Sequence, residues 1–114
     1  MSADRSGYWI GFDLGGTKMH AVLFDSQMQV LVRRRKKTRG HEGADSGVER
    51  ICSIIEKMCD EAKVPQNELA GVGIGIPGPI NMESGVILGA PNLGWKDVPL
   101  KSLLEKRLGC PVAV

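Results

Sequence analysis

One acidic residue and a group of turn residues stand at the end of a short apolar run near the start of the chain. The run, residues 9–14, contains Asp13 and is followed by Gly15, Gly16 and Thr17. An anion can approach the backbone N–H groups of glycine closely, and the hydroxyl of Thr17 adds a further donor. A carboxylate beside a phosphate would repel it unless a cation intervened, so we expect Asp13 to hold Mg²⁺ directly or through water. The stretch therefore predicts a phosphate-binding turn with a metal ion beside it.

A Gly-Gly pair between two apolar runs also has a purely structural explanation. Residues 8–14 and 19–24 have the length and the flanking turn residues of β-strands. Glycine supplies the positive φ that a tight hairpin turn needs. We therefore expect Gly15 and Gly16 to close a hairpin, whether or not they also bind a phosphate.

Two more turn clusters follow later apolar segments. In residues 69–76 glycine alternates with Val and Ile, which predicts a strand packed closely on one face. Gly78 and Pro79 come directly after it, and ligand crevices in open α/β sheets form outside the carboxyl ends of strands. The next loop contains Asn92 and Trp95. A turn role for Asn92 and a core role for Trp95 explain these two residues as well as a binding site does.

The remaining elements indicate an α/β fold. Residues 30–38 predict a third strand, and Ser46 with Glu49 has the spacing of a capping box at the start of a helix. That helix should end before Pro65, because proline disfavours helical geometry in the residue before it. A small hairpin over residues 80–88, a second helix up to residue 108 and a final strand from residue 110 complete the order. We expect a mixed five-stranded sheet in which strands 1–3 are antiparallel.

A basic run from Arg33 to Lys37 lies on the third predicted strand. It is either a nucleic-acid patch or a solvated edge strand whose charges discourage edge-to-edge pairing. No aromatic residues interleave the run, although binding of single strands would favour them. A net charge of +2 shows that the basicity is local. We expect the edge-strand explanation to hold and no nucleic acid to bind.

Composition and cysteine usage favour one globular domain in a reducing compartment. The chain has 114 residues, of which 42% are hydrophobic, and no apolar run approaches the roughly 20 residues that cross a bilayer. We expect a flexible N-terminus over residues 1–8, a domain over residues 9–114, and a cytoplasmic location without membrane contact. Cys52 and Cys59 are about 10 Å apart by helical rise, too far for a disulfide, so we expect core positions for them.

The three turn motifs together resemble the ROK family, which contains sugar kinases and transcriptional regulators, and within it the bacterial glucokinases. The residues that carry the resemblance are GFDLGGTK at 11–18, GIGIPGP at 73–79 and APNLGW at 90–95. The resemblance covers nearly the whole chain from residue 9. It implies the N-terminal lobe of an actin-like, ribonuclease-H-like two-lobe kinase that transfers the γ-phosphoryl group of ATP to a hexose, most simply glucose.

The resemblance also implies roles for single residues. The ATP phosphates would be held by one glycine-rich group of residues, Gly11, Asp13, Gly15, Gly16, Thr17 and Lys18, with Asp13 on the Mg²⁺ side. The sugar pocket would include Gly78, Pro79 and Asn92. No residue of the chain corresponds to the family's catalytic base, an aspartate expected after the fifth strand, and the zinc site of the family would also lie beyond residue 114. We therefore expect a truncated lobe that is inactive alone, from a protein that forms a homodimer when whole.

A sugar-sensing regulator of the same family is the main alternative. Such regulators carry a winged helix-turn-helix ahead of the sugar-binding part, whereas only twelve residues precede Asp13 here. The intact phosphate turn also favours a kinase. The acceptor stays open among glucose, mannose, fructose and N-acetylhexosamines.

Overall fold

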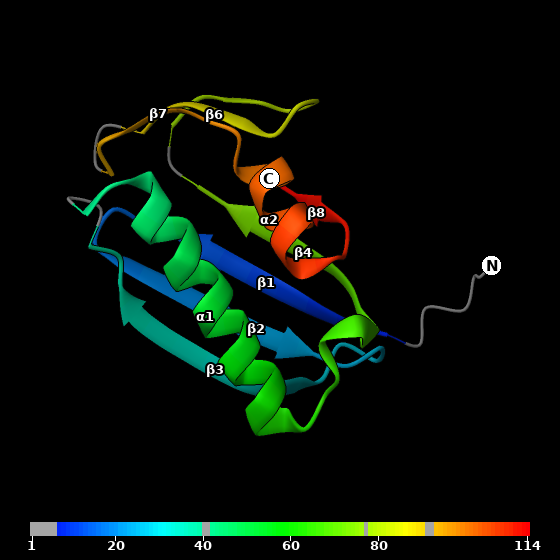
Figure 1. The fold of residues 1–114 in the computed structure, drawn as a ribbon. Helices are drawn as coiled ribbons and strands as arrows, with labels where there is room; N and C mark the ends of the chain where they lie inside the picture. Colours follow the sequence, from blue (N-terminus) through cyan, green and yellow to red (C-terminus); the bar gives the residue numbers. More distant parts are fainter. Residues whose placement is uncertain (1–6, 40–41, 77, 91–92) are drawn as a thin grey trace.

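A twisted five-stranded sheet forms the centre of the computed structural model, which describes residues 7–39, 42–76, 78–90 and 93–114 (Figure 1). The strand order is β3-β2-β1-β4-β8. β1 pairs antiparallel with β2 and β2 with β3, whereas β4 is parallel to both β1 and β8. The mixed five-stranded sheet with an antiparallel first half is therefore confirmed. The strands are β1 (Tyr8–Leu14), β2 (Lys18–Phe24), β3 (Val30–Lys37), β4 (Leu69–Gly75) and β8 (Val112–Ala113).

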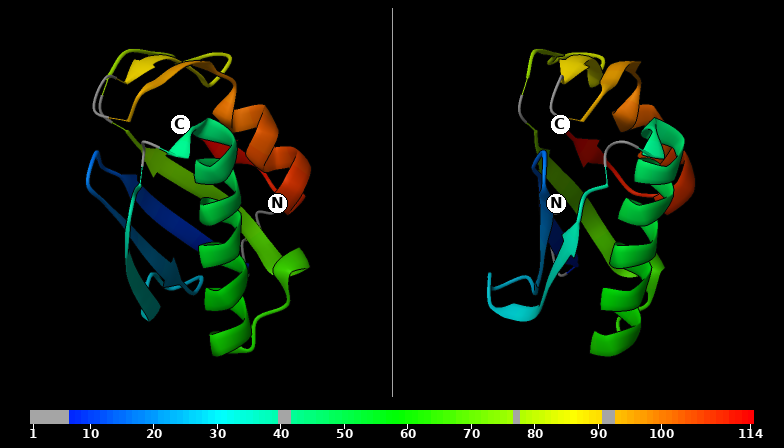
Figure 2. Two further views of the ribbon diagram at one scale, coloured as in Figure 1. Left: turned by 60° about the vertical axis from the view of Figure 1, so that its left-hand side comes forward. Right: turned by 90° about the vertical axis from the view of Figure 1, so that its left-hand side faces the viewer.

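Both helices cover the same face of this sheet. Figure 2 shows α1 (Ala44–Ala62) and α2 (Leu100–Leu108) on one side, and no helix of the described residues on the other. The covered face supplies alternate residues of β1, and the helices supply an apolar stripe at helical spacing. The core therefore lies between the sheet and the two helices. Its fully buried members include Leu14, Met19, Leu23, Ile51, Ile55, Met58, Leu100 and Leu104.

The first helix begins earlier than the capping-box pattern predicts. Gly43 is its N-cap, with a left-handed φ of 95°, and no side chain caps the helix. The N–H of Gly47 donates to the carbonyl oxygen of Gly43 at 3.1 Å, so Ser46 lies inside the first turn. The capping box is therefore wrong, whereas the predicted end is confirmed, because Lys63 adopts a left-handed conformation directly before Val64.

A second, smaller sheet stands at the end of the main sheet where β1 and β4 end (Figure 1). It contains β5 (Ile80–Asn81), β6 (Val86–Ala90) and β7 (Trp95–Val98), all antiparallel. The first two form the predicted hairpin. β7 was not predicted, and its first residue, Trp95, was expected to lie in a loop. Its four residues are too few to show a clear alternation of apolar and polar side chains.

The side chain of Trp95 connects this small sheet to α1. It is only 3% exposed. A Cβ built on Gly47 would lie 2.2 Å from Cζ2 of Trp95, so the helix approaches the indole ring at a position where only glycine fits. Trp95 is thus a core residue, which was one of the two roles that its sequence position allowed.

All three cysteines are buried and none forms a disulfide. Burial raises the pKa of Cys52, Cys59 and Cys110 above the ordinary thiol value of 9.0. The expected core positions of Cys52 and Cys59 are confirmed. None of the described helices is long and apolar enough to cross a membrane.

Candidate functional site

The two predicted binding turns lie at the same edge of the main sheet. β1 and β4 are parallel neighbours, and Asp13 is the register partner of Gly75. Both strands end within two residues of this pair, so the turn at Gly15–Thr17 and the segment at Gly78 leave the sheet side by side. The carboxyl ends of adjacent parallel strands are where open α/β sheets bind ligands.

The carboxylate of Asp13 lies on the open face of the sheet. Asp13 is exposed, while its neighbours Phe12 and Leu14 point into the core. Across the parallel pair, Gly75 carries no side chain, and a Cβ built there would meet nothing within 4 Å. Space beside the Asp13 carboxylate is therefore left for a ligand.

The glycines of β4 have different environments on this open face. A Cβ on Gly71 would lie 2.8 Å from the ring of Trp9, so close packing is confirmed there. Gly73 and Gly75 have nothing within 4 Å of such a Cβ, so the prediction of close packing is wrong for them. They leave the surface between β1 and β4 shallow instead.

Steric fit explains the first glycine of the turn, and positive φ does not. The left-handed glycines of the described residues are Gly43, Gly78, Gly85, Gly94 and Gly109. Gly15 and Gly16 are not among them, so the prediction of a positive-φ primed turn is wrong. A Cβ on Gly15 would lie 2.8 Å from the carbonyl oxygen of Lys18, to which the N–H of Gly15 also donates at 3.0 Å.

Thr38, at the end of β3, holds the turn from the other side. Its hydroxyl donates to the carbonyl oxygen of Gly15 at 2.7 Å, and its N–H donates to that of Thr17 at 2.8 Å. It is the one buried polar residue of the described ranges, at 1% exposure. The sequence interpretation missed it, although a threonine that ends a basic strand was a usable signal.

A second set of contacts supports Thr38. Nη1 of Arg50, on α1, donates to the carbonyl oxygen of Thr38 at 2.7 Å. The other guanidinium nitrogen pairs with the carboxylate of Glu42. The turn is therefore connected to α1 through one threonine and one arginine.

These contacts determine which hydrogen-bond donors of the turn remain available to a ligand. The N–H of Gly15 is used within the turn, but no described residue accepts a hydrogen bond from the N–H of Gly16 or Thr17. Thr17 is also exposed, and so is Lys18, which begins β2. Besides Asp13, this edge of the sheet therefore carries two backbone N–H groups without a described acceptor, an exposed hydroxyl and an ammonium group.

This set of groups fits a magnesium–phosphate ligand. No group of three or more His, Cys, Asp or Glu side chains that could hold a metal by themselves occurs among the described residues. Mg²⁺ is commonly bound through one or two carboxylates, with phosphate oxygens and water completing its octahedron. One exposed carboxylate at the sheet edge that also carries N–H donors without a described acceptor is compatible with such a site.

Gly78 is fixed by the small sheet. Its φ is 112°, and a Cβ there would lie 2.2 Å from the carbonyl oxygen of Gly89. The carbonyl oxygen of Pro79 accepts a hydrogen bond from Leu88 at 3.0 Å. Both residues are exposed at the edge that carries Asp13, and Asn92 lies outside the described residues.

The chain resembles known proteins over nearly its whole length. The model of the ROK family matches residues 9–114. A putative xylose repressor from Caldicellulosiruptor sp. is 37% identical over 95% of this chain and 27% of its own length. A glucokinase from Streptomyces coelicolor is 34% identical over 95% of this chain and 32% of its own length.

One solved structure has a similar sequence and the same fold. A ROK family glucokinase from Streptomyces griseus, crystallised with glucose and AMPPNP, aligns with a TM-score of 0.80 and 32% identity, over 95% of this chain and 32% of its own. The chain thus spans about a third of the length of these relatives, and its sheet and helices are those of the actin-like N-terminal part of ROK kinases. On its sequence and its fold, this chain belongs to the ROK family.

Proposed function

We propose that this chain forms the N-terminal, phosphate-binding lobe of an ATP-dependent sugar kinase with glucose as acceptor. The observation that carries the proposal is the pairing of Asp13 with Gly75. Through this pairing, the exposed carboxylate of Asp13 and the Gly78–Pro79 segment lie at one edge of the sheet. The turn that Thr38 holds by a hydrogen bond, and that has N–H groups without a described acceptor, lies at the same edge. The kinase relatives, one of them crystallised with glucose and an ATP analogue, support the same assignment.

In this proposal the residues of the chain bind and orient the substrates. The N–H groups of Gly16 and Thr17 and the Thr17 hydroxyl donate to phosphate oxygens, and Lys18 adds a positive charge. Asp13 holds Mg²⁺, which neutralises the charge that develops on the transferred phosphoryl group. Gly11, on the same face, has no side chain that would obstruct the phosphates. Gly15 allows the tight turn, in which a larger residue would not fit.

The sugar would lie against the second segment of the same edge. Gly78 and Pro79 are exposed there, and Asn92 of the third motif is the further residue that we assign to the sugar. We assign the role of general base to no residue of this chain. The isolated 114-residue chain is therefore expected to bind without turnover. We also propose a cytoplasmic location for the whole protein, since the ATP that it is proposed to use is a cytoplasmic metabolite. The homodimer is a proposal that rests on the resemblance to the ROK family alone.

A chimeric enzyme tests the kinase proposal. This chain would replace the equivalent N-terminal third of the Streptomyces coelicolor glucokinase, and ADP release would be followed with and without glucose. We expect glucose-dependent ADP release that is lost in the Asp13→Asn chimera. A folded chimera that binds glucose but releases no ADP would contradict the proposal.

A sugar-responsive transcriptional regulator is the second candidate. The 37% identity to a putative xylose repressor, slightly above the 34% identity to the glucokinase, favours it. The two candidates differ at the phosphate turn, because a regulator needs the sugar site but no Mg²⁺-dependent nucleotide site. An affinity for xylose or glucose that does not change when Mg²⁺ and ATP are added would favour the regulator.

A further inference from the structure

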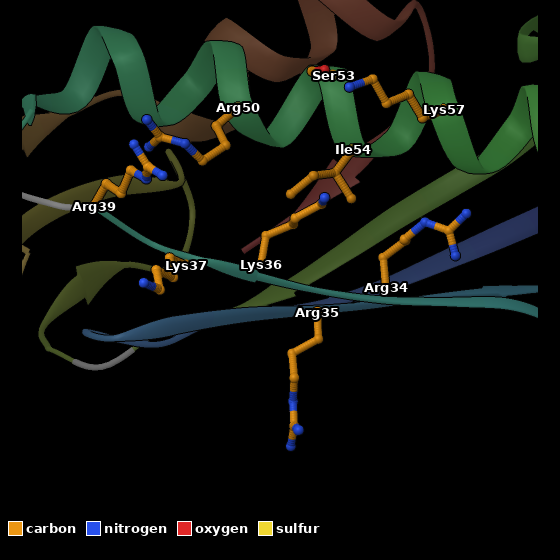
Figure 3. Close-up of a pocket in the computed structure, with 9 residues that line it drawn as sticks. All are labelled: Arg34, Arg35, Lys36, Lys37, Arg39, Arg50, Ser53, Ile54 and Lys57. Atoms are coloured by element: carbon orange, nitrogen blue, oxygen red, sulfur yellow. The ribbon is translucent and has the colours of Figure 1, made fainter.

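A basic hollow separates the edge strand β3 from helix α1. It encloses about 500 Å³, which is within the size range of small-ligand sites. Seven of its nine lining residues are Lys or Arg, and Ile54 and Ser53 are the other two (Figure 3). The basic residues are Arg34, Arg35, Lys36, Lys37, Arg39, Arg50 and Lys57.

The basic run of β3 is divided between the two faces of the sheet. Figure 3 shows Arg34 and Lys36 rising from the strand toward α1, whereas Arg35 points the opposite way. Arg35 instead donates to His20 on the open face, at 3.3 Å. The run is therefore not one continuous stripe, and only part of it meets the cations of α1.

Positive charge exceeds negative charge in this hollow. Glu42 pairs with Arg50 and lies 3.8 Å from Arg39, and Glu61 pairs with Arg34. No described carboxylate forms an ion pair with Lys36 or Lys57, although both ammonium groups border the same space. Like charges held together repel one another, so an anion between them would relieve the repulsion.

We propose that this hollow binds an anion with several linked phosphate groups, through Lys36 and Lys57 with Arg39 and Arg50 around them. Figure 3 shows Arg39 and Arg50 toward one end of the hollow and Lys57 toward the other, so a single phosphate would contact only some of these cations. A chain of linked phosphates can follow the hollow along β3 and contact all of them with charge-assisted hydrogen bonds. The phosphates belong to an inorganic oligophosphate or to the tail of a nucleotide.

The hollow is a different site from the phosphate turn. It lies between the sheet and α1, whereas Asp13 is on the open face. The two are nevertheless connected, because Arg50 borders the hollow and donates to Thr38, which holds the turn. An anion that draws Arg50 away from Thr38 would loosen the turn.

Calorimetric titration of the chain with inorganic tripolyphosphate tests this proposal. The variant Lys36→Gln, Lys57→Gln removes the two cations that have no carboxylate partner. Its matched control is Arg33→Gln, Lys106→Gln, which removes two exposed positive charges outside the hollow. We expect one tripolyphosphate per chain, an affinity at least about tenfold lower in the first variant, and a change within about twofold in the control.

Further titrations identify the source of the phosphates and separate this site from the turn. ATP is titrated without Mg²⁺, which the proposed site at the turn needs, and an affinity that falls in Lys36→Gln, Lys57→Gln under this condition assigns a nucleotide tail to the hollow. Loss of tripolyphosphate binding alone assigns an inorganic oligophosphate. The proposal is overturned if tripolyphosphate does not bind, if the control variant loses as much affinity, or if a DNA oligonucleotide binds and the control variant weakens it equally. Circular dichroism confirms that each variant is folded.

Discussion

The hydroxyl of Thr38 donates a 2.7 Å hydrogen bond to the carbonyl oxygen of Gly15, 23 residues away in sequence. The same residue holds the carbonyl of Thr17 through its N–H group. One buried residue therefore fixes both sides of the turn that we propose for phosphate binding, one side through its side chain and the other through its backbone. A turn fixed in this way presents its remaining N–H groups without further ordering, which lowers the entropic cost of binding.

Replacement of Thr38 separates its hydroxyl from its bulk. Thr38→Val keeps the shape but loses the hydrogen bond, at a cost of about 1 kcal/mol in the free energy of unfolding. Thr38→Ser keeps the hydroxyl and loses a methyl group, at a similar cost of about 1 kcal/mol. Urea unfolding should show two comparably destabilised proteins, of which only Thr38→Val has weaker Mg²⁺–ATP binding. Equal binding by both variants would mean that Thr38 serves stability alone.

Gly47 should tolerate no side chain, because Trp95 occupies the space. Gly47→Ala puts a methyl group 2.2 Å from Cζ2 of the ring. We expect it to lower the free energy of unfolding by about 1–3 kcal/mol, despite the better helix propensity of alanine. Gly73→Ala is the control, since a Cβ there meets nothing within 4 Å. Thermal unfolding measures both, and a Gly47→Ala protein as stable as the parent would contradict this packing.

Replacement of Gly78 by alanine should destabilise the fold about as much as replacement of Gly47, because Gly78 has a left-handed backbone conformation. Gly78→Ala would need a strained conformation with φ of 112° and would place its methyl group against the carbonyl oxygen of Gly89. We expect a loss of about 1–3 kcal/mol and a rearranged segment before β5. Gly89→Ala is the matched control. Gly89 is the residue that a Cβ on Gly78 would contact, but Gly89 itself has no positive φ, and a Cβ built on it would meet nothing within 4 Å. Amide chemical shifts should change throughout β5 and β6 in Gly78→Ala, but only next to the substituted residue in Gly89→Ala. Changes of equal extent in both variants would contradict the predicted rearrangement.

The buried thiols predict a loss of stability at alkaline pH. Burial raises the pKa of all three cysteines, so folded thiols stay protonated where unfolded ones ionise. Their stabilising contribution is complete below the ordinary value of 9.0 and falls as pH rises beyond it. Urea midpoints at pH 7 and pH 10 should therefore differ more for the parent than for a Cys52→Ala, Cys59→Ala, Cys110→Ala variant. The same difference in both proteins would exclude the thiols as the cause.

The sequence predicts the main sheet because each of its strands carries a strong local signal. Residues of β1 and β2 alternate inward and outward on either side of a Gly-Gly pair, and the sequence of β4 alternates glycine with Val and Ile. The four-residue strand β7 could not be predicted, since its pairing with β6 depends on a distant partner. The start of α1 was misplaced because a left-handed glycine, not the hydroxyl of Ser46, begins it.

The candidate site was predicted only in part, for a similar reason. Asp13 and the turn after it are local features, and their position at a strand end follows from the sequence. Thr38 donates a hydrogen bond to the turn, and Arg50 donates one to Thr38. Both residues are far from the turn in sequence, and only the fold brings them close to it. The two faces of the basic run also became distinct only when β3 was placed beside α1.

The turn after Asp13 is proposed to bind the phosphates of Mg²⁺–ATP. The most direct test is a titration of the ¹⁵N-labelled chain with AMPPNP, with and without Mg²⁺, followed by amide NMR. We expect the amide signals of Gly16 and Thr17 to shift in the presence of Mg²⁺ and not to shift in Asp13→Asn. Unchanged Gly16 and Thr17 signals in a folded chain saturated with nucleotide would contradict it.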